Sequence, residues 1–121
     1  MKVVIRVTGA FKKHAKPLLK KYASLPGELI QLEQDLSENP FLGTEIMPRV
    51  YKIRLAIKSK GKGKSGGARV INFHQQETTV FGLLEQSNEE AEHVIHLISI
   101  YDKSEIESIS NTDIQKLIEN I

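Results

Sequence analysis

The eight residues at positions 51–58, YKIRLAIK, place an apolar side chain at every odd position and a cation at three of the four even positions. A period of two puts successive side chains on opposite faces of a β-strand. This stretch is therefore predicted to be a strand with an apolar face toward a core and a cationic face toward something else. The next nine residues, SKGKGKSGG at positions 59–67, have the composition of a flexible basic loop.

The segments on either side of this strand predict a small domain of mixed α and β structure. The other predicted strands are residues 2–8, 68–76 and 94–101, with 78–84 extending the second of them or forming a strand of its own. The predicted helices are residues 11–22, which Pro17 interrupts or kinks, 25–36 and 114–121. We therefore expect residues 1–121 to form one α+β domain, with a twisted antiparallel sheet of about four strands that has a mixed edge, an N-terminal helical hairpin and a short C-terminal helix.

The composition limits the classes of protein to be considered. Of the 121 residues, 40% are hydrophobic and 26% are charged, which is typical of a folded domain. The chain has no cysteine, so disulfides, thiol nucleophiles and thiolate metal sites are excluded. No apolar run approaches the length of a membrane span, and charge appears too early at the N-terminus for a signal peptide. We expect a cytoplasmic protein with no membrane partner.

Cations and acids are segregated along the chain. Residues 1–24 carry seven cations and no acid, as is common on the solvated side of a helix. Residues 49–74 carry eight cations and no acid, namely Arg49, Lys52, Arg54, Lys58, Lys60, Lys62, Lys64 and Arg69. A block of this kind repels itself without compensation, so we expect an anionic partner to dock there.

Three familiar kinds of site do not fit the sequence. A phosphate-binding loop ending at Ser65 would need a glycine at position 58, which is Lys, and a helix after the loop. His93 and His96 are three apart in a predicted strand, so they face opposite sides and do not form a metal pair. His74 is a weak acid–base candidate, and no serine, histidine and carboxylate arrangement is evident. We expect neither a metal nor a cofactor.

Cations without carboxylates suit the chemistry of phosphate esters. Negative charge accumulates on the non-bridging oxygens of phosphate in the transition state, where arginine can bind it in a bidentate manner. RNA supplies its own nucleophile, the 2′-hydroxyl. A protein then has only to align this oxygen, bind the developing charge and move two protons, and a lysine crowded by other cations can act as the base.

Several motifs resemble those of one family. They are the residues YKIR at 51–54, the basic loop followed by GGARVI at 66–71, LISIYDKSE at 97–105, and Asn39 and Pro40 before Gly43. In this combination and order the chain resembles the RelE/ParE toxin superfamily, and most closely its HigB-like branch, which are toxins of bacterial type II toxin–antitoxin systems. The resemblance covers most of the chain and implies a RelE-like fold.

The resemblance also implies an activity and a site. Such toxins enter the ribosomal A site and cut mRNA through its 2′-hydroxyl, which stops translation. The residues that match the family's catalytic positions are Lys52, Arg54, Arg69, Tyr101 and Lys103. The loop lysines expected to touch ribosomal RNA or mRNA are Lys58, Lys60, Lys62 and Lys64. The family's C-terminal catalytic tyrosine has no equivalent here, because Ile109 falls near its place, and Tyr101 is the stacking candidate.

The resemblance further implies partners, and it leaves alternatives open. The partners would be the ribosome, mRNA and a cognate antitoxin that is acidic or offers an amphipathic helix or strand. The alternatives are a ParE-like protein that inhibits DNA gyrase by binding, and an inactive relative that only binds RNA. Simple alternation places Arg69 on the same side as Ile71 and Phe73, so we expect a bulge near Gly66 and Gly67 to turn it outward.

Overall fold

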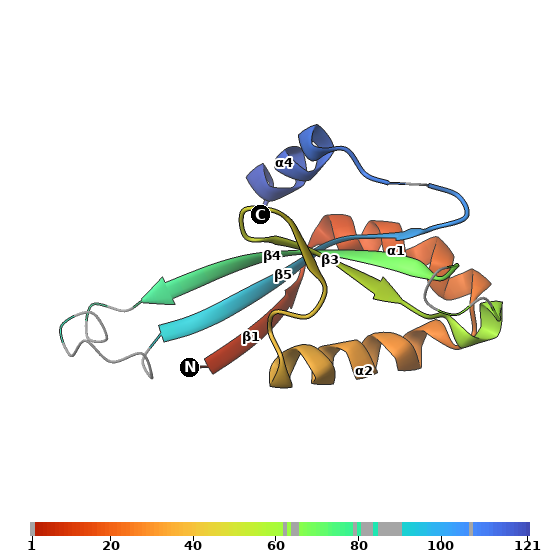
Figure 1. Cartoon of the computed structure of the whole chain (residues 1–121), viewed down its shortest axis with the longest axis horizontal. Coiled ribbons are helices and arrows are strands. Elements are labelled where there is room, and N and C mark those ends of the chain that lie inside the picture. Colours follow the sequence, from red (N-terminus) through yellow and green to blue (C-terminus); the bar gives the residue numbers. More distant parts are fainter. Residues whose placement is uncertain are drawn as a thin grey trace.

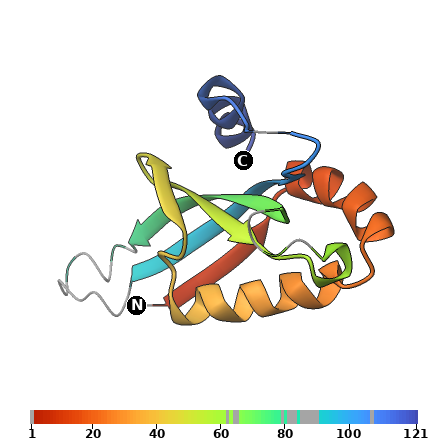
Figure 2. The same ribbon diagram turned by 45° about the vertical axis from the view of Figure 1, so that its right-hand side comes forward.

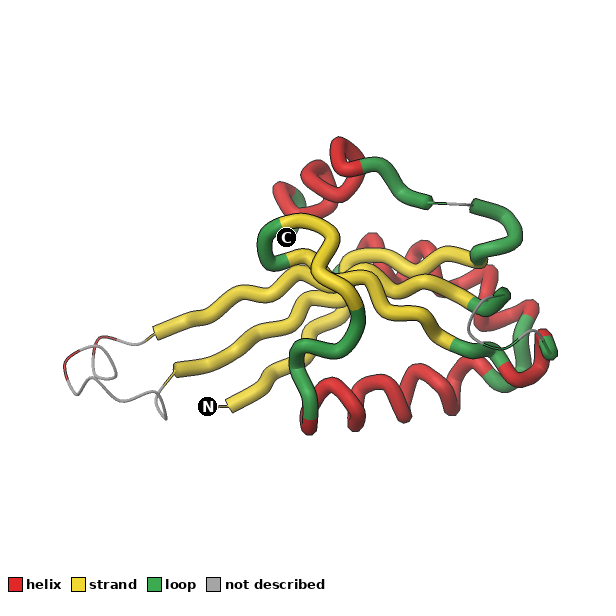
Figure 3. Tube along the Cα trace, in the orientation of Figure 1, coloured by secondary structure: helices red, strands yellow, loops and turns green. Residues whose placement is uncertain are grey.

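The computed structural model describes residues 2–61, 63, 66–78, 80, 84, 91–106 and 108–121. These residues form a five-stranded mixed sheet in the order β1-β5-β4-β3-β2. The strands are β1 (Lys2–Val7), β2 (Thr44–Met47), β3 (Val50–Leu55), β4 (Ala68–Thr78) and β5 (Ala91–Asp102). The helices are α1 (Gly9–Lys21), α2 (Leu25–Glu38), the 3-10 helix η1 (Lys58–Lys60) and α4 (Asn111–Glu119). Figure 1 shows this arrangement, and Figure 3 shows β1, β5 and β4 running side by side.

The α+β class is confirmed, but the expected count of about four strands is wrong. β1 pairs with β5 in parallel, and all other neighbouring strands are antiparallel, so the mixed edge is present. The additional strand is β2, which has only four residues and no buried side chain. It lies close to β3 because Gly43, with φ of +93°, lacks a Cβ that would lie 2.5 Å from the Lys52 carbonyl oxygen.

The helices cover both faces of the sheet. Apolar residues of α1 and α2, such as Phe11 and Leu36, pack with Ile53, Val70 and Ile95 in the larger core. A second core, on the opposite face, contains Val50, Ile71, Ile98, Tyr101 and, from α4, Ile114. Figures 1 and 2 accordingly show α2 and α4 on opposite sides of the strands. The strand predicted over residues 51–58 is shorter than expected, because β3 ends at Leu55 and Lys58 begins η1. Within β3, Ile53 and Leu55 face the larger core and Val50 faces the α4 core, so the period of two separates the two cores.

The two N-terminal helices do not pack along each other as the predicted helical hairpin would. α1 lies mainly against β5 and α2 lies along β1, with few contacts between the two helices. α1 continues through Pro17 without interruption. It begins at Thr8, whose side-chain oxygen accepts a hydrogen bond from the Phe11 amide at 3.1 Å. The two helices diverge because each buries its apolar side against the sheet.

The strand expected over residues 78–84 does not continue past Thr78, where β4 ends, and the described residues Val80 and Leu84 are helical instead. Residues 79, 81–83 and 85–90 lie outside the described residues. β5 begins at Ala91, three residues before the predicted start. At the other end of the chain, Ser110 caps α4, since its hydroxyl accepts a hydrogen bond from the Asp113 amide at 3.1 Å.

Candidate functional site

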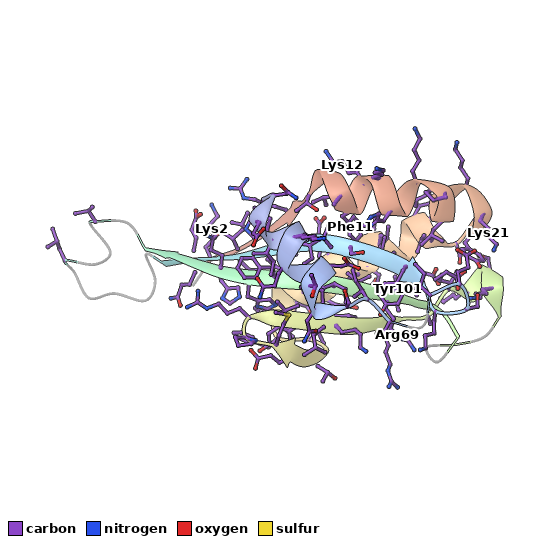
Figure 4. The ribbon with its side chains drawn as sticks, turned by 90° about the horizontal axis from the view of Figure 1, so that it is seen from above. Lys2, Phe11, Lys12, Lys21, Arg69 and Tyr101 are labelled. Carbon is purple, nitrogen blue, oxygen red and sulfur yellow. The ribbon has the colours of Figure 1, made fainter. Side chains whose placement is uncertain are left out.

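Three residues of the predicted site form a row across three neighbouring strands. Arg54 of β3 lies opposite Arg69 of β4, and Arg69 lies opposite Tyr101 of β5. Directly opposed residues of neighbouring strands project from the same face of a sheet. Figure 4, viewed from the α4 side, shows Arg69 and Tyr101 at the same end of the sheet. The row Arg54–Arg69–Tyr101 therefore lies on one face, the face that α4 partly covers.

The two remaining predicted catalytic residues lie next to the row. Lys52 is two residues before Arg54 on β3, and therefore on the same face. Lys103 follows directly after β5, and its backbone amide donates a hydrogen bond to the Gly67 carbonyl oxygen at 3.0 Å. The structure thus gathers all five predicted catalytic positions at one end of the β3, β4 and β5 strands.

The expected bulge near Gly66 and Gly67 is wrong. β4 pairs regularly with β3 and β5 from Ala68 onward, and its register shift lies further along, between Ile71 and Asn72. Arg69 shares its face with Ile71, as simple alternation requires. Arg69 does not have to turn to the other face, because one face of the sheet carries both the α4 core and, nearer the end of β4, the row.

Burial within the row is uneven. Arg54 is exposed, Lys52 and Lys103 are half-buried, and the side chains of Arg69 and Tyr101 are only 4% and 5% exposed. Arg69 Nη1 donates a hydrogen bond to its neighbour, the Ala68 carbonyl oxygen, at 3.1 Å. Within the described part of the chain, the buried Tyr101 hydroxyl has no hydrogen-bond partner of good geometry. Burial raises the pKa of Tyr101, and the Arg69 charge and the nearby Ile109 backbone oppose this only in part, so Tyr101 is a neutral phenol at pH 7.

A cavity of about 690 Å³ opens beside Tyr101. It lies between α1, the end of β5, the segment that follows β5, and α4. Its lining includes the half-buried His14, whose Nδ1 lies 2.9 Å from the Ser99 hydroxyl. The opening carries both signs of charge: the cations Lys13, Lys21 and Lys116, and the acids Asp102, Glu105 and Asp113, with Lys21 and Glu105 forming an ion pair at 3.2 Å.

The predicted RNA-binding lysines have different surroundings. Lys58 is exposed, and its backbone amide donates a hydrogen bond to Glu28 Oε2 at 2.7 Å. The Lys60 side chain is 9% exposed, and its ammonium forms an ion pair with the buried carboxylate of Asp102. Lys62 and Lys64 lie outside the described residues.

A carboxylate that compensates one charge of the basic segment comes from elsewhere in the chain. Asp102, 42 residues from Lys60, forms an ion pair with the Lys60 ammonium, whereas Glu28 accepts a hydrogen bond from the Lys58 backbone amide. The repulsion expected within residues 49–74 is therefore relieved inside the protein at Lys60, while the docking of an anionic partner on the rest of the segment stays a prediction. Asp102 is also the main site residue that the sequence did not reveal, since nothing local shows which cation it meets.

His74 lies on the opposite face from the row. Its neighbour Phe73 packs in the α4 core, so His74 points the other way, and its Nδ1 lies 2.8 Å from His93 Nε2. His96 instead meets Gln75 Oε1 at 3.1 Å, away from His93. In the described ranges, no group of three or more histidine or acidic side chains could hold a metal ion.

No protein-family model matches this chain, and neither does any curated protein sequence. None of the helices that the structure describes is long and apolar enough to cross a membrane. The interpretation of the row therefore depends on its own geometry and on the motifs in the sequence.

Proposed function

We propose that the protein is the toxin of a bacterial type II toxin–antitoxin system, a ribosome-dependent endoribonuclease that cuts mRNA and inhibits translation. The observation that supports this most strongly is the register of Arg54, Arg69 and Tyr101, which brings two arginines and a tyrosine onto one face of three adjacent strands. These residues match the RelE-like motifs and come from three separate segments of the sequence. The fold is correspondingly proposed to be RelE-like.

The row suits cleavage by the substrate's own hydroxyl. The 2′-oxygen attacks the adjacent phosphorus and gives up its proton, the bond from phosphorus to the 5′-oxygen breaks, and that oxygen takes a proton. The products are a 2′,3′-cyclic phosphate and a 5′-hydroxyl end. Arg54 and Arg69 bind the charge that develops on the non-bridging oxygens, because guanidinium groups stay protonated. Lys52 and Lys103 flank the row, and we assign the two proton transfers to them as part of the proposal.

Tyr101 contributes a hydrogen-bond donor and an aromatic ring. A phosphate oxygen would supply the acceptor that its hydroxyl lacks within the described chain, and its ring offers a surface on which a base can stack. Tyr101 shares a core with Ile114 of α4, so contact with RNA requires α4, or the segment before it, to move aside. Exposed Arg54 would then meet the substrate first.

The test is expression of the Arg69→Ala variant, with Arg6→Ala as a control that removes an exposed arginine from the far edge strand. We expect the parent and Arg6→Ala to arrest growth and to create new mRNA 5′-hydroxyl ends on ribosome-bound messages. In Arg69→Ala, cleavage of mRNA on purified ribosomes should fall by about 100-fold or more. Because Arg69 is buried, its replacement can also disturb folding. Arg54 is exposed, so Arg54→Ala is a second variant that removes a cation of the row without opening a cavity.

The outcomes separate the competing functions. Full cleavage by folded Arg69→Ala and Arg54→Ala would overturn the site. Arrest of DNA replication before translation, with no new mRNA ends, would replace the proposal by ParE-like inhibition of gyrase. Binding to ribosomes or RNA without cleavage would identify an inactive relative.

A further inference from the structure

The carboxylate of Asp102, the last residue of β5, joins three elements that are distant in sequence. Its side chain has no exposed surface. It accepts hydrogen bonds from the Tyr22 hydroxyl at 2.5 Å and the Lys60 ammonium, and from the Ser104 amide and hydroxyl at 2.9 and 2.7 Å. Burial alone would raise the pKa of Asp102, but the hydrogen bonds from Lys60, Tyr22 and Ser104 outweigh it and hold this pKa well below its usual range.

Lys60 is directed inward as well. In addition to the ion pair, its ammonium donates a hydrogen bond to the Ser104 hydroxyl at 3.0 Å and lies 5.8 Å from the centre of the Tyr22 ring. A phosphate could reach this ammonium only by breaking the pair with Asp102, which would leave a buried carboxylate without its partner. Lys58, two residues earlier, has an exposed side chain instead.

Both ends of the basic loop are held by hydrogen bonds. At its start, the Ser59 amide donates a hydrogen bond to the Ser24 hydroxyl at 2.9 Å, which docks η1 onto the beginning of α2. At its end, the Gly67 carbonyl accepts the hydrogen bond from the Lys103 amide. Lys60, which pairs with Asp102, lies between these two anchors in the sequence. Asp102 itself lies between Tyr101 and Lys103.

We propose that Tyr22, Lys60, Asp102 and Ser104 form a latch that fixes the basic loop to the end of β5 and thereby positions Tyr101 and Lys103 beside Arg69. Lys60 is then a positioning residue, and its charge is used inside the protein rather than on RNA. This inference rests on the proposed function for its effect on catalysis. The latch itself is a property of the fold and can be tested without activity.

The first experiment compares Lys60→Met with Lys58→Met, which removes the same charge from the same loop. The rate of amide hydrogen exchange is measured across the loop and at Lys103. We expect Lys60→Met to accelerate exchange at the Lys103 amide by about tenfold or more, because the loop loses its anchor, and Lys58→Met to leave it unchanged. Equal exchange in the two variants would overturn the latch.

The second experiment measures cleavage of mRNA on purified ribosomes, with kcat and KM determined separately, and ribosome affinity as a function of salt. A displacement of catalytic groups lowers kcat, so we expect Lys60→Met to lose about tenfold or more in kcat with little change in the salt dependence. Lys58→Met should raise KM and reduce the salt slope, as loss of a phosphate contact does. A reduced slope in Lys60→Met would show that Lys60 contacts RNA and would overturn its assignment.

A further variant guards against misfolding. Tyr22→Phe removes one hydrogen bond to Asp102 without changing any charge. We expect it to lower kcat, as Lys60→Met does. An unchanged kcat in folded Tyr22→Phe and Lys60→Met would overturn the positioning role. Accelerated exchange in Lys60→Met together with an inactive parent protein would support the latch and refute the proposed function.

Discussion

His74 and His93 form a histidine pair inside the protein, away from the row. Phe41 and Tyr51 contact the His74 ring, with centroids at 5.5 and 4.5 Å. Burial, assisted by the neighbouring His93, lowers the pKa of His74 to about 4, although Glu45 acts in the opposite direction. Burial lowers the pKa of His93 as well. Both rings are therefore neutral at pH 7 and share one hydrogen bond.

This pair predicts a loss of stability in mild acid. An unfolded histidine binds a proton below about pH 6.5, whereas folded His74 resists protonation down to about pH 4. The contribution of His74 is therefore complete above about pH 6.5 and is lost as the pH falls toward 4. Urea denaturation across this range should show the free energy of unfolding falling less in His74→Gln than in the parent. Parallel pH profiles for the two proteins would contradict the assignment.

Gly67 controls how the basic loop joins β4. A Cβ at this position would lie 2.1 Å from the Leu55 carbonyl oxygen, which is backbone and cannot turn away. The contact is at the end of β3, so any shift would be transmitted to the neighbouring row. Gly27 in α2 provides the matched comparison, because a Cβ there would have no other atom within 4 Å.

We expect Gly67→Ala to destabilise the protein by about 1–3 kcal/mol, because β3 and the loop must separate. Gly27→Ala should stabilise it by about 0.5–1 kcal/mol, since alanine favours the helix. Denaturant unfolding of both variants measures the difference. Equal stability of Gly67→Ala and the parent would show that the close approach to Leu55 is not needed.

α4 is held to the sheet by the fully buried side chain of Ile114 and by the partly buried Leu117 and Ile118 beside it. Ile114 packs in the core that contains Ile71, Ile98 and Tyr101. Few other contacts join α4 to β5, so this element is expected to open more readily than the strands beneath it. Its opening is the movement that would expose Tyr101.

Ile114→Ala should therefore weaken the docking of α4, with a loss of about 2 kcal/mol or more from the missing core contacts. Hydrogen exchange of the α4 amides should accelerate, while exchange in the centre of β4 and β5 changes little. Ile121→Ala, which alters an exposed side chain beyond the helix, should leave both unchanged. Uniform acceleration over the sheet and α4 would show that they unfold together.

For the whole molecule, the distribution of charge predicts how binding depends on salt. The net charge is only +2, yet among the described residues the half-buried Lys52 and the exposed Arg54 lie on β3, and the exposed Lys58 follows it. Each phosphate contact releases counterions, so the proposed function predicts that ribosome affinity falls steeply as salt increases. The exposed Arg54 is expected to make one such contact, and Arg54→Ala should reduce the slope by about one. Affinity that is independent of salt would contradict binding through phosphates.

Local patterns in the sequence predicted most of the elements. The period of two in β3 and the helical spacing in α1, α2 and α4 identify their apolar sides, because each depends only on neighbours along the chain. β2 escaped prediction since a four-residue strand with no buried side chain has no such pattern. The motifs also named the cations of the row, again from residues close in sequence.

Other features depended on contacts between distant parts of the chain. The pairing of Arg54 with Arg69 and Tyr101 follows from strand register, which is set by every contact along β3, β4 and β5. The ion pair of Lys60 with Asp102 joins residues 42 positions apart. Periodicity records which side of an element is apolar, and so the sequence by itself determined the elements and the kind of charge they carry. Only the tertiary structure decided which charges are neutralised internally and which remain for a ligand, because partners brought together by folding leave no mark on the local pattern.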